Sequence, residues 1–417
     1  MKLIAKTLTG VILASMLAAP AWAATQWSFS GSLMYKTFWT ERDYGKFEGE
    51  DLQGGGAALK SDGILDWSTQ GDSTISMEMR SDHLEGYIEM NYDFEENSLT
   101  TSQYWGKYNF SPEGGILIGQ TEHLFRQFIS SQVAFDNINL NGIGTAYAET
   151  APMIALNYGG FTFALVKPEE DIDGIMGAME HIESQLVMPP GFTPPDDSGI
   201  YYDLETYLPQ IQASYEYFAD AWRIKVSGGY AGFKVKDLTE WAYYTGLGTF
   251  YEYAKDTTIH SWIVGLDGDI NFGPLTLASA GSVGQNWSAA GWNVTDFSIG
   301  SYPIMSMAGK LKDTTSVMAS IVAAYQLTEA LRFEGGAGYR YDNNPVFDKA
   351  SHTWGVYLQA DYAVADGFYI IPEIGYIDCG DFVGNDNWID ASGDYRLKGG
   401  ASEGYLWYAG MQWKMDF

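Results

Sequence analysis

Three things are scarce in this sequence: cysteine, basic residues and long hydrophobic runs. Cys379 is the only cysteine among 417 residues, so neither an intramolecular disulfide nor a cysteine-based zinc site can form. We expect Cys379 to be a small residue at a strand end. The chain has 23 Lys and Arg against 53 Asp and Glu, a net charge of −30. Because binding to phosphates needs a basic surface, we expect no nucleic-acid partner.

Beyond the N-terminal segment, no apolar run approaches the roughly 20 residues that a membrane-spanning helix needs. Only helices and closed barrels satisfy their backbone polar groups in lipid, so a membrane location would require a β-barrel. The mean hydropathy of −0.16 does not separate a soluble protein from a barrel, because half of each barrel strand faces water.

The first residues have the three parts of an export signal. Lys2 and Lys6 form a charged start, residues 8–19 form an apolar run, and Ala21-Trp22-Ala23 fits an A-x-A cleavage site. We expect a Sec signal peptide over residues 1–23, leaving 24–417 as a single barrel domain. The alternative is an uncleaved membrane anchor, but the apolar run is short for a spanning helix.

Aromatic residues and glycine are abundant. Phe, Trp and Tyr make up 15% of the chain and there are 48 glycines, whereas soluble chains contain about 7% glycine. Tyrosine and tryptophan are favoured where one end of the ring is wet and the other apolar, as in the girdles of membrane barrels.

The C-terminal residues alternate strictly. Tyr405, Trp407, Trp413 and Phe417 fall on one face, and the intervening residues become polar toward the end. Strict alternation indicates a strand with different surroundings on its two faces. A terminal aromatic on the apolar face fits the last strand of an outer-membrane barrel, so we interpret these four residues as a terminal signal for membrane insertion.

Alternating runs recur along the chain, joined by short turns on one side and longer polar segments on the other. This pattern predicts an all-β fold, a transmembrane antiparallel up-and-down β-barrel of about sixteen strands with short periplasmic turns and long external loops. Fourteen or eighteen strands remain open, because residues 56–68 could be an extra strand or an extension. The expected strands are 26–40, 73–80, 85–94, 101–110, 115–121, 151–158, 161–167, 206–218, 221–235, 257–271, 275–287, 313–327, 330–342, 351–364, 367–379 and 403–417.

Charged residues recur on the face that would point inward. In 330–342 this face carries Arg332, Glu334, Arg340 and Asp342. A soluble β-sandwich also alternates, but it rarely turns so many charges inward, because unpaired buried charge is costly. Sixteen strands enclose a lumen wide enough for water.

With this architecture the chain resembles the general trimeric porins of Gram-negative outer membranes. The resemblance implies a cell outer-membrane location, passive diffusion of ions and small hydrophilic solutes, and a homotrimer. It also implies contact with outer-membrane lipid and lipopolysaccharide, and insertion by the barrel-assembly machinery. The short second loop, 95–100, departs from the family, so a latching loop between subunits is in doubt.

In these porins the third external loop folds into the lumen and narrows it. Here that loop is 122–150, long and rather apolar, which favours packing against the wall. The resemblance implies acidic groups on the loop facing a basic cluster on the wall. The candidates for this constriction are Glu122, Arg126, Asp136, Glu149, Arg80, Lys107, Lys36 and Lys414. Arg126 and His123 could instead anchor the loop.

Acidic residues concentrate in the predicted loops. They could form a solvated rim, or a negative potential that concentrates cations at the pore mouth. We expect cation preference from the net charge. Divalent cations could also bridge these loops, although no EF-hand-like spacing occurs and no other cofactor is expected. Within the long loop 168–205, the apolar spacing predicts a short helix over 172–188.

Other function classes have weaker support. We expect no enzyme, because no G-x-S-x-G, H-E-x-x-H, P-loop or dinucleotide-binding motif occurs. A substrate-specific channel for sugars or anions is the main alternative. Inward aromatics are scattered rather than aligned as a sugar-binding slide: Trp105, Tyr357, Tyr369, Phe233 and Tyr408. A surface β-protein such as an adhesin is a third reading.

Overall fold

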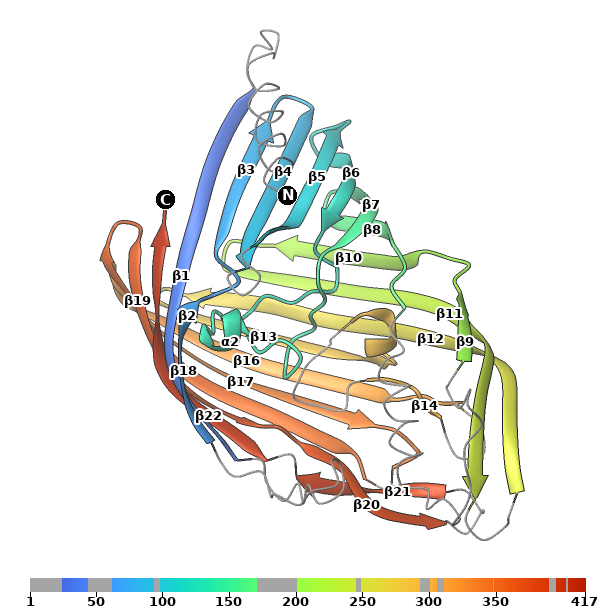
Figure 1. Cartoon of the computed structure of the whole chain (residues 1–417). Helices are drawn as coiled ribbons and strands as arrows, with labels where there is room; N and C mark the ends of the chain where they lie inside the picture. The colour runs from blue at the N-terminus through green and yellow to red at the C-terminus, as the bar shows by residue number, and fades with distance from the viewer. Residues whose placement is uncertain are drawn as a thin grey trace.

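The computed structural model describes residues 25–43, 62–93, 98–170, 201–244, 249–292, 301–305, 311–347, 349–389, 395–402 and 404–417. Their regular structure is almost entirely β (Figure 1). The main sheet consists of β1 (Gln26–Asp43), β2 (Asp62–Thr69), β3 (Thr74–Arg80), β4 (Leu84–Asp93), β5 (Ser98–Asn109), β6 (Gly114–Thr121), β7 (Ala151–Tyr158), β8 (Phe161–Val166), β9 (Tyr201–Glu205), β10 (Gln210–Phe218), β11 (Trp222–Tyr244), β12 (Thr249–Phe272), β13 (Leu275–Gln285), β16 (Thr315–Thr328), β17 (Leu331–Asn343), β18 (Ser351–Ala365), β19 (Phe368–Asp378) and β22 (Tyr405–Asp416).

The sheet is antiparallel and closes on itself. β1 pairs with β22 from Ser32↔Asp416 to Asp43↔Tyr405, which joins the first strand to the last. At two places in the barrel, one strand is interrupted, so two short strands lie end to end along the same neighbour. β2 and β3 both pair with the same edge of β1, and β9 and β10 both pair with β11. The described residues therefore form a closed antiparallel barrel of sixteen strands, which confirms the predicted fold class.

The question of residues 56–68 is settled for the part that the structure describes. β2 continues the line of β3 along β1, with a break at residues 70–73, so it extends the predicted strand 73–80 and adds no position to the ring. Residues 44–61 lie outside the described ranges.

Several predicted loops contain strands. The segment 236–256, expected to be a loop, continues the β11–β12 hairpin, and the segment 380–402 contains β20 (Asp381–Ile389) paired with β21 (Tyr395–Ser402). A hairpin that leaves the membrane has water on both faces, so its sequence no longer alternates between apolar and polar. A further short pair, β14 (Ile304–Met305) with β15 (Leu311–Lys312), lies in the predicted loop 288–312.

Both ends of the described barrel lie on the side of the short turns (Figure 1). The turns at Gly159 and Gly273 need left-handed backbone, with φ of 57° and 62°, which glycine adopts without strain. The terminal Phe417 exchanges two backbone hydrogen bonds with Gly31, at 2.8 and 3.0 Å. Its ring lies over Gly31, where a Cβ atom would come within 2.7 Å of the ring.

The outer wall is apolar and exposed, whereas the inner face of strands such as β16 is buried. On β16, Val317 and Ile321 are exposed on the outer face, and Met318 and Val322 are buried on the inner face. Large exposed hydrophobic residues occur all around the barrel, among them Phe29, Leu358 and Ile374. This distribution places a hydrocarbon solvent outside the barrel.

The four residues interpreted as a terminal insertion signal lie on the outer face of β22 or at its end. Trp407 packs edge-on against Trp39, with ring centroids 4.4 Å apart. Tyr405 stacks on Tyr376 at 5.7 Å. Trp413 and Phe417 are exposed. Among the described residues, no helix is long and apolar enough to cross a bilayer.

Candidate functional site

The loop 122–150, between β6 and β7, lies inside the ring of strands and carries the short helix α2 (Ala134–Asn137) (Figure 1). Its first part contacts the wall near β10–β13. The Leu124 N–H donates to Gln212 Oε1 at 2.9 Å, and Lys225 Nζ donates to the carbonyl of Arg126 at 3.0 Å. Gln127 Nε2 reaches the backbone carbonyls of Leu266 and Gly281, at 3.3 and 3.2 Å.

Two buried carboxylates hold the middle of the loop. Glu334 on β17 accepts the backbone N–H of Ser131 at 2.7 Å, and Glu373 on β19 accepts that of Val133 at 2.7 Å. A tyrosine supports each carboxylate: Tyr357 donates to Glu334 at 2.6 Å and Tyr408 donates to Glu373 at 2.8 Å. Charge-assisted bonds to backbone N–H groups are strong, so these contacts fix the path of the loop.

The turn at residues 142–145 touches the wall directly. Arg340 Nη1 donates to the Gly142 carbonyl at 3.1 Å, and Ser320 Oγ donates to the Gly144 carbonyl at 2.9 Å. A Cβ atom on Gly144 would lie 2.6 Å from the Cα of Gly338. Glycine at both positions is therefore what allows the two backbones to approach.

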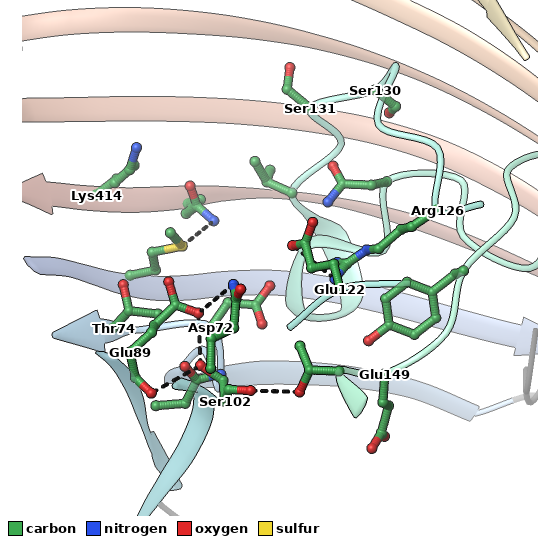
Figure 2. A pocket seen from close by; sticks show the side chains of 18 of the residues that line it. Asp72, Thr74, Glu89, Ser102, Glu122, Arg126, Ser130, Ser131, Glu149 and Lys414 are labelled. Atoms are coloured by element: carbon green, nitrogen blue, oxygen red, sulfur yellow. Dashed lines mark hydrogen bonds and ion pairs between the residues drawn. The ribbon is translucent and has the colours of Figure 1, made fainter. Parts of the chain in front are cut away.

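The loop leaves a cavity of about 820 Å³ on the side of β3–β6 (Figure 2). Strands β18, β19 and β22 close one side, and loop residues from Glu122 to Thr150 close the other. Among the described residues that line it, neutral hydroxyl and amide side chains predominate. They are Thr74, Asn91, Thr100, Thr101, Ser102, Gln103, Gln120, Ser130, Ser131, Asn139, Thr150, Gln359 and Gln412.

The charges that line this cavity are unequal in number. Five are carboxylates and two are cations among the described lining residues: Asp72, Glu89, Glu122, Glu149 and Asp361, against Arg126 and Lys414. Figure 2 labels six of them: Glu89 and Lys414 on strands, Asp72 in the break between β2 and β3, and Glu122, Arg126 and Glu149 on the loop.

Each of the two cations already has an acidic partner. Arg126 Nη1 lies 3.2 Å from Glu122 Oε1, and its guanidinium sits over the rings of Phe128 and Tyr147 at 4.3 and 4.6 Å. Lys414 Nζ lies 3.0 Å from Asp416 Oδ2.

By contrast, Glu89 is bound by neutral groups. It accepts the hydroxyls of Tyr87 and Ser102, each at 2.7 Å. These bonds orient the carboxylate and leave its charge uncompensated. The cavity is therefore a polar space with an excess of negative charge.

Burial changes two titrations in the loop. The pKa of Glu122 is raised because the carboxyl is desolvated, an effect that the neighbouring Arg126 and Lys225 only partly offset. Burial lowers the pKa of His123 to about 4. Its Nδ1 lies 2.5 Å from Gln212 Nε2, whose amide oxygen is taken by Leu124 N–H, so Nδ1 accepts and the ring is neutral.

The eight residues predicted for the constriction fall into three groups. Glu122, Arg126, Glu149 and Lys414 line the cavity. Asp136 lies in α2, but its side chain is outside the described set.

The three remaining predicted residues are not in the lining, and each is paired elsewhere on the wall. Lys36 lies 2.9 Å from Asp66, Lys107 lies 3.8 Å from Glu85, and Arg80 lies 2.6 Å from Glu78. In the described cavity the strand side therefore carries carboxylates as well as Lys414, where the resemblance implied a basic cluster.

Sequence reasoning missed Asp72, Glu89 and Asp361. Glu89 and Asp361 fall on the inward face of correctly predicted strands, so alternation alone could have found them. Asp72 falls in the break between β2 and β3, which was predicted as the end of a loop.

The inward aromatics do not line the cavity. Tyr357, Tyr408 and Phe233 are buried beneath loop segments. Tyr147 is the only aromatic residue in the described lining, and its ring is covered by Arg126.

Among the described residues, no group of three or more histidine, cysteine or acidic side chains could hold a metal ion. Most of the acidic loop residues that could bridge divalent cations lie outside the described ranges. So do the expected signal peptide 1–23 and the expected helix 172–188. Cys379 is buried just after the end of β19.

Comparison with solved structures shows the fold. The sequence matches no protein-family profile and no curated protein. The outer membrane channel DcaP of Acinetobacter baumannii is similar in structure, with a TM-score of 0.58 and 13% identity over 96% of this chain and 99% of that one. An anion-selective porin from Comamonas acidovorans has a TM-score of 0.52 and 10% identity, over 94% of this chain and 100% of that one.

A third similar structure is the trimer form of OmpT, an outer membrane protein of Vibrio cholerae. Its TM-score is 0.50 with 12% identity, over 95% of this chain and all of that one. At these identities the likeness concerns the fold over nearly the full length of the chain. With its closed barrel, apolar outer wall and inward-folded loop, the chain has the fold of the outer-membrane porins.

Proposed function

We propose that this protein is an outer-membrane porin for passive diffusion of ions and small hydrophilic solutes. The observation that carries the proposal is the polar cavity between loop 122–150 and strands β3–β6, inside a barrel whose outer wall is apolar. A solute that crosses the barrel there meets hydroxyl, amide and charged groups. The loop sets the size limit, and its contacts with Glu334 and Glu373 keep that limit constant.

Cation preference is the second part of the proposal. Five lining carboxylates against two paired cations give the described cavity a negative potential, which raises the local concentration of cations and lowers that of anions. The net charge of −30 acts in the same direction. Anion selectivity is a property of the Comamonas porin, and we do not attribute it to this protein.

A channel specific for sugars or anions is the alternative. A sugar path needs aligned aromatic rings, and the described lining offers Tyr147 alone, already covered by Arg126. An anion path needs unpaired basic groups, whereas Arg126 and Lys414 both have acidic partners. These features favour a general, cation-preferring path, and they also favour a channel over an enzyme or an adhesin.

The cellular setting follows from the same proposal. An exposed apolar outer wall fits the lipid and lipopolysaccharide of a Gram-negative outer membrane, reached by a Sec signal over residues 1–23. The exposed aromatic residues of β22 and Phe417 would be recognised by the barrel-assembly machinery. A homotrimer is proposed because a similar structure is a trimer form.

Reconstitution of the folded protein into planar bilayers tests the proposal. Stepwise conductance in KCl, together with swelling of liposomes in small neutral sugars, is expected from an open diffusion pore. Small conductance blocked by one sugar or anion would favour the specific channel. Absence of channels from protein with a folded barrel would reject the pore.

A further inference from the structure

A second loop segment also enters the lumen. Residues 286–292 follow β13 and include the short 3-10 helix η1 (Ser288–Ala290). Trp287 and Trp292 in this segment have no exposed surface. The sequence pattern placed Trp287 at the end of the predicted strand 275–287 and Trp292 in an external loop. Indoles buried inside a barrel indicate that the segment packs against something within it.

The segment is fixed to the wall by hydrogen bonds. Trp292 Nε1 donates to Gln210 Oε1 at 3.0 Å, and Gln210 Nε2 donates to the Ala290 carbonyl at 3.0 Å. Trp287 Nε1 donates to the Trp262 carbonyl at 2.9 Å. The ring of Trp287 lies across Gly284, where a Cβ atom would be 2.0 Å from its Nε1.

Trp292 also touches loop 122–150. It forms an antiparallel backbone bridge with Ala148, and its ring centroid lies 5.1 Å from that of Phe125. These residues belong to one apolar cluster of buried side chains that joins both loops to the wall: Phe125, Ala146, Ala148, Ala231, Ile263, Trp287, Ala290, Trp292 and Met318. The cluster contains no charged or hydrogen-bonding side chain apart from the two indoles.

The neighbours of these loop residues face the cavity. Ala146 and Ala148 belong to the apolar cluster, whereas Tyr147 and Glu149, which alternate with them, line the cavity. In the same way Phe125 belongs to the cluster and Arg126 lines the cavity. Trp292 and its cluster therefore pack behind the backbone that presents Arg126, Tyr147 and Glu149 to the cavity.

We propose that Trp292 is a positioning residue of the charge filter, by which we mean the charged residues that line the cavity, an inference that rests on the proposed porin function. By filling the space behind residues 125–126 and 146–149, it holds the Arg126–Tyr147 stack and the Glu149 carboxylate at the cavity wall. Substitution of Trp292 by alanine leaves a void behind this backbone. The loop then moves away from the cavity, and Arg126, Tyr147 and Glu149 lose their fixed positions.

Thiol labelling tests the packing without reference to transport. Cys379 is the only native cysteine and is buried, so a change in labelling of the Ala148→Cys variant reports on the introduced thiol. In Ala148→Cys the thiol is expected to be protected from a water-soluble maleimide. Adding Trp292→Ala should raise the labelling rate by about tenfold or more, because local opening governs access to a buried thiol. Trp292→Phe, which keeps a ring in the cluster, should restore much of the protection.

Channel recordings test the positioning itself. Trp292→Ala should increase open-channel current noise and change the cation preference relative to the parent, and Trp292→Phe should restore both. Trp222→Ala on the exposed outer wall is the matched control and should change neither. If Trp292→Ala does not yield a folded barrel, Gln210→Leu replaces it. This variant removes the hydrogen bonds of Gln210 to Trp292 and Ala290, and it should change the labelling rate and the channel noise in the same direction.

The outcomes distinguish the positioning role of Trp292 from the proposed porin function. Protected Ala148→Cys thiol in a folded Trp292→Ala barrel would overturn the inference. Faster labelling with unchanged noise and selectivity would also overturn it, because Trp292 would then stabilise the fold without positioning the filter. If the labelling behaves as expected but the parent forms no channel, the packing is upheld and the porin function fails.

Discussion

The carboxylate of Glu373, on the inner face of β19, accepts the backbone N–H of Val133 at 2.7 Å. The other oxygen of the same carboxylate lies 3.3 Å from the N–H of Ala134, and the hydroxyl of Tyr408 donates to it at 2.8 Å. The start of α2 is thus tied to the barrel wall through one buried acidic side chain. The position of the whole loop depends on contacts of this kind.

Removal of the Glu373 carboxylate should therefore loosen the loop. Glu373→Ala leaves two buried N–H groups without acceptors, each of which costs about 1–3 kcal/mol. We expect faster amide hydrogen exchange at Val133 and Ala134 and a noisier open channel. Glu329→Ala, in an exposed turn, is the control and should leave both unchanged. Unchanged exchange in Glu373→Ala would contradict the anchoring role.

The lining charges should control selectivity in opposite directions. Glu89→Gln keeps the acceptor for Ser102 but removes a negative charge, so the cation-to-anion permeability ratio should fall. Lys414→Gln removes a positive charge and should raise the ratio. One charge acting on an ion at about 4 Å in water is worth about 1 kcal/mol, which corresponds to a factor of roughly five for each ion, in opposite directions for the cation and the anion.

Reversal potentials under a KCl gradient measure these ratios. Glu78→Gln is the matched control, because Glu78 pairs with Arg80 away from the cavity. Equal shifts in Glu78→Gln and Glu89→Gln would place the filter elsewhere.

Acidification should weaken cation preference through Glu122. Burial raises the pKa of this carboxyl, so it becomes neutral at a higher pH than an ordinary glutamate does, and the negative potential of the cavity decreases there. Recording the permeability ratio against pH should give a decline that begins above the usual glutamate range. Glu122→Gln should remove that early part of the decline. A variant whose profile overlays the parent would rule out Glu122 as the titrating group.

His123 should make the stability of the first part of loop 122–150 depend on pH. Its pKa is lowered to about 4 in the folded protein, against 6.5 for an ordinary histidine, because the ring is buried. The unfolded state therefore binds the proton first. The stabilising contribution of the neutral ring is complete above about pH 6.5 and is lost as the pH falls toward 4, by roughly 3 kcal/mol in all.

Protease susceptibility of the loop between pH 7 and pH 4 measures this effect. The parent should become more susceptible on acidification, whereas His123→Gln, which cannot titrate, should show a flatter profile. A parent profile as flat as that of the variant would show that His123 does not couple the loop to pH.

Much of the barrel was predictable because lipid and water impose a strict alternation on spanning strands. The alternation predicted in 330–342, with Arg332 and Glu334 on the inward face, is found in β17. The terminal alternation that leads to Phe417 is found in β22. Alternation ceases where both faces of a hairpin lie in water. This is why the extensions of β11 and β12 and the pair β20–β21 were mistaken for loops.

The site was less predictable, because it depends on which side of the lumen a loop leaves open. The sequence contains Glu122, Glu149 and Lys414 as candidates, but nothing local distinguishes them from Lys107 or Arg80, which pair elsewhere. Burial of Trp287 and Trp292 depends on glycines and glutamines of distant strands. Trp287 at the end of a predicted strand and Trp292 in the loop that follows were the one signal that this segment folds inward.

The reversal potential of the parent protein in a tenfold KCl gradient tests the central claim most directly. The described lining has five carboxylates and two cations, both of them paired, which predicts that potassium permeates more readily than chloride. A reversal potential of the sign set by potassium, carried by stepwise channels, is the expected result. A potential of the opposite sign would contradict the account, because chloride would then be the preferred ion in a cavity lined with carboxylates.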